Sequence, residues 1–594
     1  MSYLPPLIKR LSTPRSQWIA SLLWLAIVSI IALFWRLGST GLVDETEPLF
    51  AEAARQMLQT GDWITPYFNE ATRFDKPPLI YWLMAIAYRI GGVNAWSARL
   101  PSALAAVGLT LMGFYTLLHF GVPGLGTTAR ESPPQEQLSA PPSQRHWATA
   151  LVGATAVAFN LQTVVWGRTG VSDMLLSGCM GSALFAFFLG YAQPERPRRQ
   201  RGWYVAFYVL IALAILAKGP IGIVLPGIIV LGFLLYLGNW RALQELRPLL
   251  GIALVLGLTL PWYALVIRAN GQAYIDSFFG YHNVQRFTQV VNNHAAPGYF
   301  YFLVVAIGFI PWSMYLPWGL WRLRLWQVGD WRRRPRDQQL GLFAAVWLLA
   351  VFGFFTVAVT KLPSYTLPLL PAAAVLVAPM ASLYQRPMGI SKAAKFPRGL
   401  QLSGWVNTAF FIALAGVVWF SGPWMGDDPA MPRLPEAIAA AKVLWWGAAG
   451  WLLAAALSAL LTWRRSHRLW LASVVGFGTF LLLTLIPALD LMDAQRQRPL
   501  RQLAATIAEQ SQPGETVTMV GFQKPSLVFY AQRPVTYIYT PAKAIAHLRQ
   551  QQGSVLLLGR PEEIARRLTP DQYDLLSEAG TYQLVRVYPS RLSK

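Results

Sequence analysis

Long apolar segments separated by short polar connections make up most of the chain. Each segment carries almost no charge and has roughly the 20 residues that a helix needs to cross the hydrocarbon layer of a membrane. The segments lie near 18–36, 96–120, 147–166, 174–192, 203–217, 219–238, 249–267, 299–321, 340–360, 363–383, 401–421, 441–462 and 469–488. The pattern predicts a polytopic bundle, mostly α, of about 13 transmembrane helices.

The pattern changes after residue 488, where charged residues become more frequent. Short runs at 516–522, 535–539, 554–559 and 582–588 are typical of strands, and helical stretches at 499–511, 541–551 and 561–568 separate them. Strands that alternate with helices predict a small α/β domain. We therefore expect a transmembrane domain over 1–488 and an accessory α/β domain over 489–594.

The distribution of charge supports a membrane protein and predicts its orientation in the membrane. Only 13% of the 594 residues are charged, against about a quarter in soluble domains, and the net charge is +23. Alternate connections hold most of the basic residues, as at 196–201 and 322–336, which is typical of cytoplasmic loops. We expect an integral protein of the inner or plasma membrane with a cytoplasmic N-terminus and an extracytoplasmic C-terminal domain. Nucleic-acid binding is disfavoured, because the basic residues do not form one patch.

Ionisable residues gather in the connections on the other side. They come from separate loops that meet at one membrane face, and they are Asp44, Glu45, Glu47, Asp75, Lys76, Arg168, Asp173, Lys218, His282, Arg286 and Lys361. The predicted spans themselves are nearly free of charge, as expected when a charge at the bilayer centre costs a few kcal/mol. This distribution favours chemistry at the outer face over transport across the membrane.

The first outer loop, 37–95, predicts two helices that lie along the interface. The first begins at Pro48 and ends at Gly61, and the second runs from Pro77 to about 90. Lys76 directly precedes the second helix, where helix amide groups attract anions. A phosphate contact is the favoured interpretation, with a lysine that reaches the lipid headgroups as the alternative.

The other candidates each have a plainer alternative. Arg168 and Asp173 flank a tight turn, so they could form an ion pair, or Asp173 could hold a metal or a substrate hydroxyl. His282 and Arg286 share a face of a helix and suit a phosphate, or they belong to a solvated helix. Lys218 and Lys361 each lie close to a proline at the end of a span and could simply set the topology. A single cysteine, Cys179, allows no internal disulfide and no cysteine metal site.

Several motifs together resemble a known family. They are Asp44-Glu45, the run from Phe50 to Leu58 (FAEAARQML), the run from Phe74 to Trp82 (FDKPPLIYW), Ser172-Asp173, Lys218-Gly219-Pro220, His282-Asn283 with Arg286, and Lys361-Leu362-Pro363-Ser364-Tyr365. In order and loop placement the chain resembles the polyprenyl-phosphate-sugar-dependent glycosyltransferases of the C-type fold. That family includes the lipid A aminoarabinose transferase and the protein O-mannosyltransferases.

The resemblance implies inverting transfer of a sugar from a polyprenyl phosphate to a lipid, glycan or protein acceptor at the outer face. Asp44, with Glu45 and Glu47 beside it, would supply the catalytic carboxylate. Lys76, Arg286, Lys361 and Tyr365 would bind the donor phosphate. Substrate contacts would come from Tyr81, Arg168, Asp173, Lys218, His282 and Asn283. No cofactor is required, and a divalent metal stays an open alternative.

Two alternatives to this function stay open, a transporter of lipid-linked sugars and a non-catalytic membrane scaffold. The chain also departs from the family at one point. It has Leu49-Phe50 where the family often has Arg-Tyr, so either Asp44 or Glu47 could face the cavity.

Overall fold

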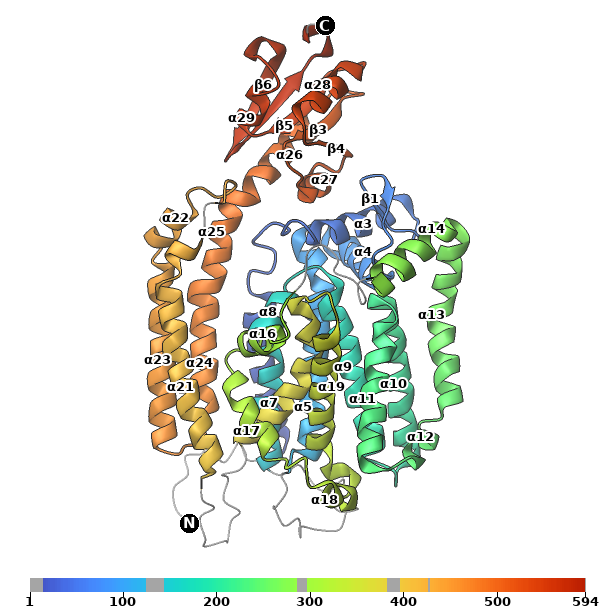
Figure 1. Ribbon diagram of the computed structural model, residues 1–594, viewed down its shortest axis with the longest axis vertical. Coiled ribbons are helices and arrows are strands. Elements are labelled where there is room, and N and C mark those ends of the chain that lie inside the picture. Colours follow the sequence, from blue (N-terminus) through green and yellow to red (C-terminus); the bar gives the residue numbers. More distant parts are fainter. Residues whose placement is uncertain (1–13, 124–143, 286–295, 382–395, 426–427, 593–594) are drawn as a thin grey trace.

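A helical bundle carries a small α/β domain at one end (Figure 1). The computed structural model describes residues 14–123, 144–285, 296–381, 396–425 and 428–592. Within these ranges, ten helices are long and apolar enough to cross a membrane. They are α2 with η1 (Pro14–Ser29, Ile30–Phe34), α5 (Ala95–Phe120), α9 (Ser172–Tyr191), α10 (Pro197–Lys218), α13 (Pro248–Asn270), α19 (Leu340–Val357), η5 to η6 (Pro363–Ala381, including α20, Leu370–Val377), α21 (Arg398–Trp419), α23 (Val443–Trp463) and α24 to α25 (Trp470–Arg496).

The expected count of thirteen spans needs a correction. Two expected spans are bent helix pairs, α7 with α8 (Gln144–Ala158, Leu161–Gly167) at 55° and α16 with η3 and α17 (Phe300–Gly308, Ser313–Tyr315, Leu316–Trp321) at 114°. Counting each pair once gives up to twelve spans within the described ranges. The segment expected at 219–238 is α11 (Ile221–Leu237), whose 17 residues make it short for a span. Every predicted apolar segment is therefore helical, but three of them are not straight, full-length spans.

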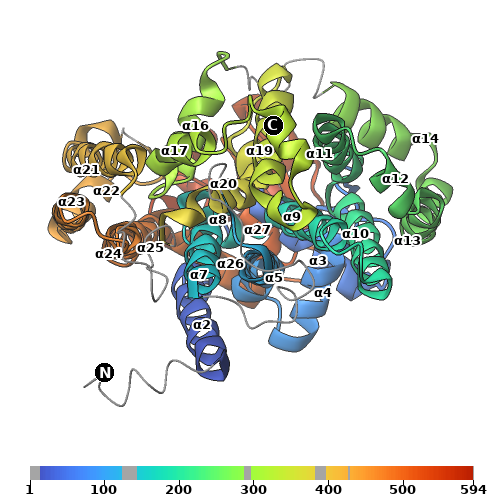
Figure 2. The same ribbon diagram turned by 90° about the horizontal axis from the view of Figure 1, so that it is seen from below.

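Helix α9 forms the centre of the bundle. Its apolar stretch is completely buried, whereas that of α13 is only 28% buried. A helix that is apolar all round belongs either in a protein core or against lipid, and these two helices illustrate both cases. Viewed from below, α13 and the group of α21, α23 and α24 lie on opposite flanks of the bundle (Figure 2).

The C-terminal domain is built on a mixed five-stranded sheet in the order β4-β3-β5-β7-β6. Strands β3, β4 and β5 are parallel, and β7 and β6 continue the sheet antiparallel. The strands are β3 (Thr516–Val520), β4 (Val535–Ile538), β5 (Val555–Gly559), β6 (Tyr573–Ala579) and β7 (Tyr582–Val587), with helices α26 (Arg498–Gln510), α27 (Pro525–Ala531), α28 (Pro541–Gln550) and α29 (Pro561–Ala565).

The four predicted strands and three predicted helices of this domain are present, but β6 and α27 were not predicted. The predicted boundary after 488 falls inside a helix, because α25 (Ile486–Arg496) continues the last span without a break. The connection between the two domains is therefore a continuous helix up to Arg496.

The loop over 37–95, predicted as the first outer loop, lies between the bundle and the C-terminal domain (Figure 1). It contains both predicted helices, α3 (Glu47–Thr60) and α4 (Leu79–Gly91). A short hairpin of β1 (Tyr67–Phe68) and β2 (Ala71–Thr72) joins them. Helix α3 is mostly buried, so it is a packed layer between the two domains and does not lie free on the membrane surface.

Candidate functional site

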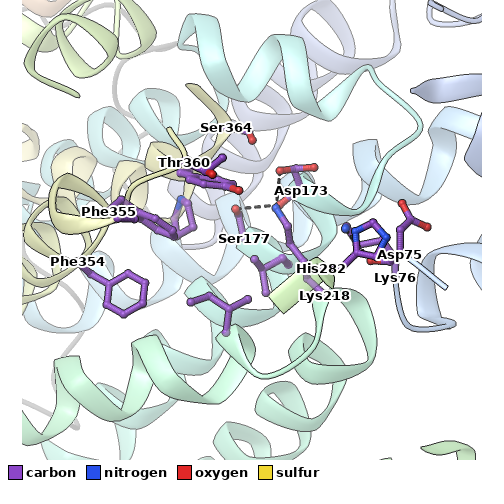
Figure 3. Close-up of a pocket in the computed structure, with 15 residues that line it drawn as sticks. Asp75, Lys76, Asp173, Ser177, Lys218, His282, Phe354, Phe355, Thr360 and Ser364 are labelled. Carbon is purple, nitrogen blue, oxygen red and sulfur yellow. Dashed lines mark hydrogen bonds and ion pairs between the residues drawn. The ribbon is translucent and has the colours of Figure 1, made fainter. Parts of the chain in front are cut away.

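A pocket of about 120 Å³ opens at the end of the bundle that carries the C-terminal domain (Figure 3). The first outer loop, the start of α9, the junction of α10 and α11, the π-helix η2 (Ile275–Gln285) and the turn from α19 into η5 (Pro363–Leu369) all contribute to it. Its polar lining residues are Asp75, Lys76, Asp173, Ser177, Lys218, His282, Thr360, Ser364 and Tyr365. The structure thus brings together loops that are far apart in sequence, as the charge distribution predicts.

Asp173 and Lys218 form an ion pair inside this pocket. Their Oδ1 and Nζ atoms lie 2.7 Å apart, and the side chains are only 15% and 16% exposed. Asp173 lies in the first turn of α9 and Lys218 is the last residue of α10. The Lys218 ammonium also lies 5.5 Å from the ring centre of Tyr365. A carboxylate and a cation are therefore fixed side by side in a partly dry site.

Of the two alternatives for this turn, an ion pair between Arg168 and Asp173 is not formed. Arg168 lies in the same turn, but its Nη1 donates to the Ala32 carbonyl at 3.5 Å. Asp173 lies in the first turn of α9, which packs beside α10. Lys218, the last residue of α10, therefore lies closer to the Asp173 carboxylate than Arg168 does. Arg168 is not among the described residues that line the pocket.

The pocket wall next to Lys76 is held rigid by Asp75. Its carboxylate accepts from Arg73 Nη2 at 2.6 Å and from the Tyr81 hydroxyl at 3.2 Å. Burial alone would raise the pKa of Asp75, but Arg73, Lys76 and His282 outweigh it and leave that pKa below its usual range. Lys76 donates to the Asp75 carbonyl at 2.7 Å. Tyr81 thus orients the wall from behind and is not a lining residue.

The η5 side of the pocket presents Tyr365, whose ring stacks on Phe355 at 4.8 Å. Gln162 fixes this segment from α8, because its Nε2 donates to the Pro363 carbonyl at 2.6 Å and to Thr366 Oγ1 at 2.9 Å. Lys361 donates to the Ala358 carbonyl at 2.9 Å and lies beside the described lining residues, not among them. Gln162 was not predicted, since it is uncharged and lies about 200 residues away in the chain.

His282 lines the pocket from η2. The backbone of Asn283 belongs to the same π-helix, but its side chain lies outside the described residues, and so does Arg286. The predicted phosphate contact of Arg286 therefore stays a prediction.

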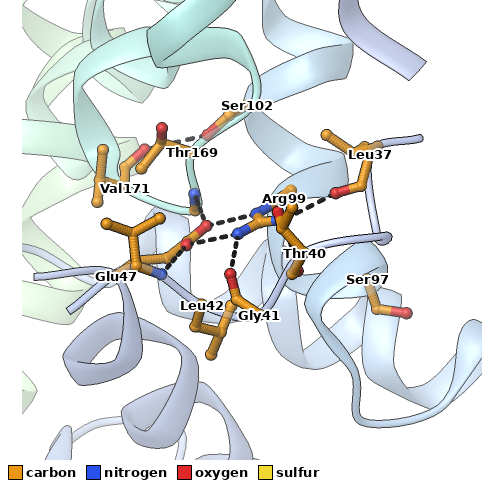
Figure 4. Close-up of polar contacts among 12 residues, drawn as sticks. Leu37, Thr40, Gly41, Leu42, Glu47, Ser97, Arg99, Ser102, Thr169 and Val171 are labelled. Carbon is orange, nitrogen blue, oxygen red and sulfur yellow. Dashed lines mark hydrogen bonds and ion pairs between the residues drawn. The ribbon is translucent and has the colours of Figure 1, made fainter. Parts of the chain in front are cut away.

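Glu47 lies in a separate buried cluster (Figure 4). Its carboxylate accepts from Arg99 at 2.8 and 2.9 Å, from the Val43 amide at 2.8 Å and from the Gly170 amide at 2.7 Å. The exposed fractions of the Arg99 and Glu47 side chains are 4% and 1%. Because Gly170 belongs to the turn that precedes Asp173, Glu47 positions one wall of the pocket and is not itself among the described residues that line it.

Asp44 faces the C-terminal domain. Its carboxylate accepts from the Ser526 amide at 2.9 Å, from the Ser526 hydroxyl at 2.8 Å and from Gln497 Nε2 at 2.8 Å. Gly41, three residues earlier, packs closely against the C-terminal domain, since an added Cβ would lie 2.8 Å from the Tyr530 hydroxyl. Glu45, its neighbour, is exposed. None of the three predicted catalytic carboxylates therefore contributes to the described lining of the pocket.

A second contact closes the same junction. Asn69 donates to the Val535 carbonyl at 2.9 Å and accepts from the Val535 amide at 2.8 Å. Val535 begins the edge strand β4, whose outer side would otherwise present unpaired backbone groups. We call these contacts of Asp44 and Asn69 the domain latch.

Replacing Asp44 by alanine is expected to loosen the domain latch. Three hydrogen bonds to a carboxylate are lost, and at about 1–1.5 kcal/mol each the docking should weaken by roughly 3–4.5 kcal/mol. Amide hydrogen exchange at 524–531 should rise accordingly. The matched control is Glu45→Ala, which removes an exposed carboxylate one residue away. Equal amide hydrogen exchange at 524–531 in the two variants would show that Asp44 does not hold the C-terminal domain in place.

Asp44→Asn separates docking from catalysis. Asparagine keeps the shape and can still accept from the Ser526 amide, so docking should survive in large part. If Asp44 were the catalytic carboxylate, this variant would lose transfer while its exchange pattern stayed close to wild type.

Comparisons with known proteins agree with this architecture. Residues 145–264 match the family described as dolichyl-phosphate-mannose-protein mannosyltransferase, and residues 510–594 match the C-terminal domain of cyanobacterial RgtA-type glycosyltransferases. Among the described residues, no three His, Cys, Asp or Glu side chains cluster in a way that could hold a metal ion.

Two relatives illustrate the range. An undecaprenyl phosphate-alpha-4-amino-4-deoxy-L-arabinose arabinosyl transferase of Shewanella sediminis is 29% identical over 396 residues, which is 66% of this chain and 64% of that protein. An uncharacterised protein of Aquifex aeolicus is 32% identical over 345 residues, which is 58% of this chain and 68% of that protein.

A solved structure shows the same fold over nearly the whole length. The crystal structure of ArnT from Cupriavidus metallidurans bound to undecaprenyl phosphate superposes with a TM-score of 0.75. It covers 97% of this chain and 99% of that chain at 22% sequence identity.

Proposed function

Because the chain belongs to the family of polyprenyl-phosphate-sugar-dependent glycosyltransferases with the C-type fold, we propose that it transfers a sugar from an undecaprenyl-phosphate donor to an acceptor at the outer face of the membrane. The observation that carries the proposal is the pocket in which Lys76, Lys218 and Asp173 meet. The pocket provides cations that can bind a phosphate and a carboxylate that can act on an acceptor. The donor class is proposed from the activity of the Shewanella relative and from the lipid bound in the ArnT structure.

The two lysines would bind the phosphate of the donor, which is the leaving group. As the bond from the sugar carbon to the phosphate oxygen breaks, negative charge grows on that oxygen, and fixed cations stabilise it in a pocket with little water. Lys76 and Lys218 line the pocket from different elements, the first outer loop and the end of α10. We propose that Arg286 and Tyr365 complete this phosphate site.

Asp173 would act on the acceptor. Its charge is neutralised by Lys218 at 2.7 Å. A donor phosphate competes for the same ammonium, so its binding frees the Asp173 carboxylate next to the reacting carbon. The acceptor oxygen then attacks that carbon from the face opposite the phosphate and inverts it. A hydroxyl acceptor would give its proton to Asp173, whereas a phosphate acceptor has no proton to lose.

The chemistry as proposed requires no metal ion, because side-chain cations supply the positive charge. The orientation follows the distribution of Lys and Arg, with the pocket and the C-terminal domain outside and the N-terminus in the cytoplasm. The C-terminal domain lies next to the first outer loop (Figure 1), and that loop supplies Asp75 and Lys76 to the pocket.

Transfer of a labelled sugar is the experiment that tests the proposal. Purified protein in vesicles is given a panel of undecaprenyl-phosphate sugars together with membrane lipid, glycan and peptide acceptors. We expect one donor to yield an inverted product and free undecaprenyl phosphate, with activity retained in EDTA. Sealed vesicles that expose the C-terminal domain should accept added donor without permeabilisation. Donor binding and movement across the vesicle without transfer to any acceptor would instead favour a transporter.

A further inference from the structure

A second cavity lies at the opposite end of the bundle. It has a volume of about 570 Å³ and lies between the end of α5, the turn after α9 and the start of α10. Along α10, Arg199 of this cavity precedes Lys218 of the pocket by 19 residues, a length of about 29 Å at 1.5 Å per residue. The two cavities are therefore separated by roughly the thickness of the hydrocarbon layer, about 30 Å. This cavity belongs to the other membrane interface and has no part in the proposed transfer.

One wall of the cavity is cationic. Arg199 lines it together with His119 and Gln193, and it follows Arg196 and Arg198 at the start of α10. The first turn of α10 contains no acidic residue, and within the described parts of the chain Arg199 forms no ion pair. The nearby carboxylate of Glu245 is already held at 2.7 and 2.8 Å by Arg336.

The other wall is aromatic and apolar. The Tyr115 ring lies 4.1 Å from that of His119 and 5.7 Å from that of Trp203, measured between ring centres. Gly202 and Ala206 form the rest of the lining, and a Cβ added at Gly202 would meet no atom within 4 Å. Trp and Tyr are the residues that prefer the boundary between headgroups and acyl chains.

We propose that this cavity binds the headgroup of an anionic phospholipid from the leaflet opposite the candidate active site. The guanidinium of Arg199 offers the paired donors that suit a phosphate, and His119 offers a further ring nitrogen. Trp203 and the open surface at Gly202 receive the glycerol and the first part of an acyl chain. Basic pockets between membrane helices, bounded by interfacial aromatic residues, match this class of ligand. The phosphate alone could also come from solution, and the lipid is favoured because Tyr115, Trp203 and Ala206 form an apolar wall beside the cationic one.

The test uses the full-length protein, delipidated in detergent and examined by native mass spectrometry. Phosphatidylglycerol is titrated against phosphatidylcholine, and inorganic phosphate is added as a competitor. We expect saturable binding of phosphatidylglycerol that weakens about tenfold or more in Arg199→Ala. Arg201→Ala is the matched control, since it removes an exposed arginine two residues away that does not line the cavity. That variant should stay within about twofold of wild type, because Arg201, although exposed like Arg199, does not line the cavity.

Three outcomes would overturn the proposal. Equal losses in the two arginine variants would mean diffuse attraction to the surface charge. Equal affinity for phosphatidylcholine would mean that no anionic group is recognised. Displacement of phosphatidylglycerol by millimolar inorganic phosphate, with the same dependence on Arg199, would assign the site to a soluble anion. Binding of the undecaprenyl-phosphate donor should not change in Arg199→Ala, which confirms that the variant is folded.

Discussion

Replacing Lys76 by alanine is expected to lower kcat for sugar transfer by about 100- to 1000-fold, the usual cost of removing one charge-stabilising group from a transition state. Lys76 is the lining cation whose backbone is most constrained. Pro77 and Pro78 follow it, and Asp75 before it is anchored by Arg73 and Tyr81. The alanine variant should therefore keep its fold and lose charge only at the phosphate. Initial rates of undecaprenyl phosphate release measure the effect.

Lys361→Ala is the comparison that makes this result specific. Lys361 is a second lysine at the same membrane face, and its ammonium is bound to the Ala358 carbonyl beside the pocket. Its removal should lower kcat by less than about tenfold, because a charge at the rim is screened by solvent. Equal losses in the two variants would mean that the phosphate binds nearer the rim, and that the assignment of Lys76 is wrong.

Replacing Glu47 by alanine is expected to destabilise the transmembrane domain by about 3–5 kcal/mol, because it leaves the buried guanidinium of Arg99 without its counter-charge. It also removes the acceptor for the Val43 and Gly170 amides. Thermal unfolding in detergent should show a clear loss against Glu45→Ala, an exposed position where about 0.5 kcal/mol or less is expected.

The conservative variant Glu47→Gln distinguishes a structural role from a catalytic one. Glutamine keeps the oxygen that accepts from Gly170 but loses the charge opposite Arg99, so its stability should fall between that of wild type and that of the alanine variant. Its transfer rate should fall only as far as the turn before Asp173 is loosened. A stable Glu47→Gln protein that has lost all transfer would show that the Glu47 carboxylate takes part in the reaction.

Much of the architecture follows from the sequence because it depends on local patterns. Each apolar segment predicts a helix, and the alternation of strands and helices predicts the C-terminal domain. The missed elements, β6 and α27, have weak local signals. Helix α27 has only seven residues, and β6 is an edge strand in which no residue is fully buried. Hydrophobic alternation is strongest where one face of a strand is buried, so such an edge is hard to detect.

The candidate site likewise contains some features that the sequence predicts and others that it does not. Lys76, Asp173, Lys218 and His282 were predicted because charged residues at the ends of spans meet at one membrane face, and Tyr365 was predicted from its motif, which resembles the family. The partners of Glu47 and Asp44 were not predicted. The ion pair of Glu47 with Arg99 joins residues 52 positions apart, and Asp44 reaches Ser526 across 482. Contacts of this kind depend on how helices pack, and no spacing in one sequence specifies them.

The domain latch has a consequence for exchanging parts between relatives. Asp44 and Asn69 belong to the transmembrane half of the chain, yet their hydrogen-bond partners are Ser526 and Val535 in the C-terminal half. A chimera that receives the last hundred residues of another protein would contain only one partner of each of these hydrogen bonds from the original protein. The loop that contains Asp44 and Asn69 must therefore be exchanged together with the C-terminal domain. The two segments form one structural unit, although hundreds of residues separate them in the sequence.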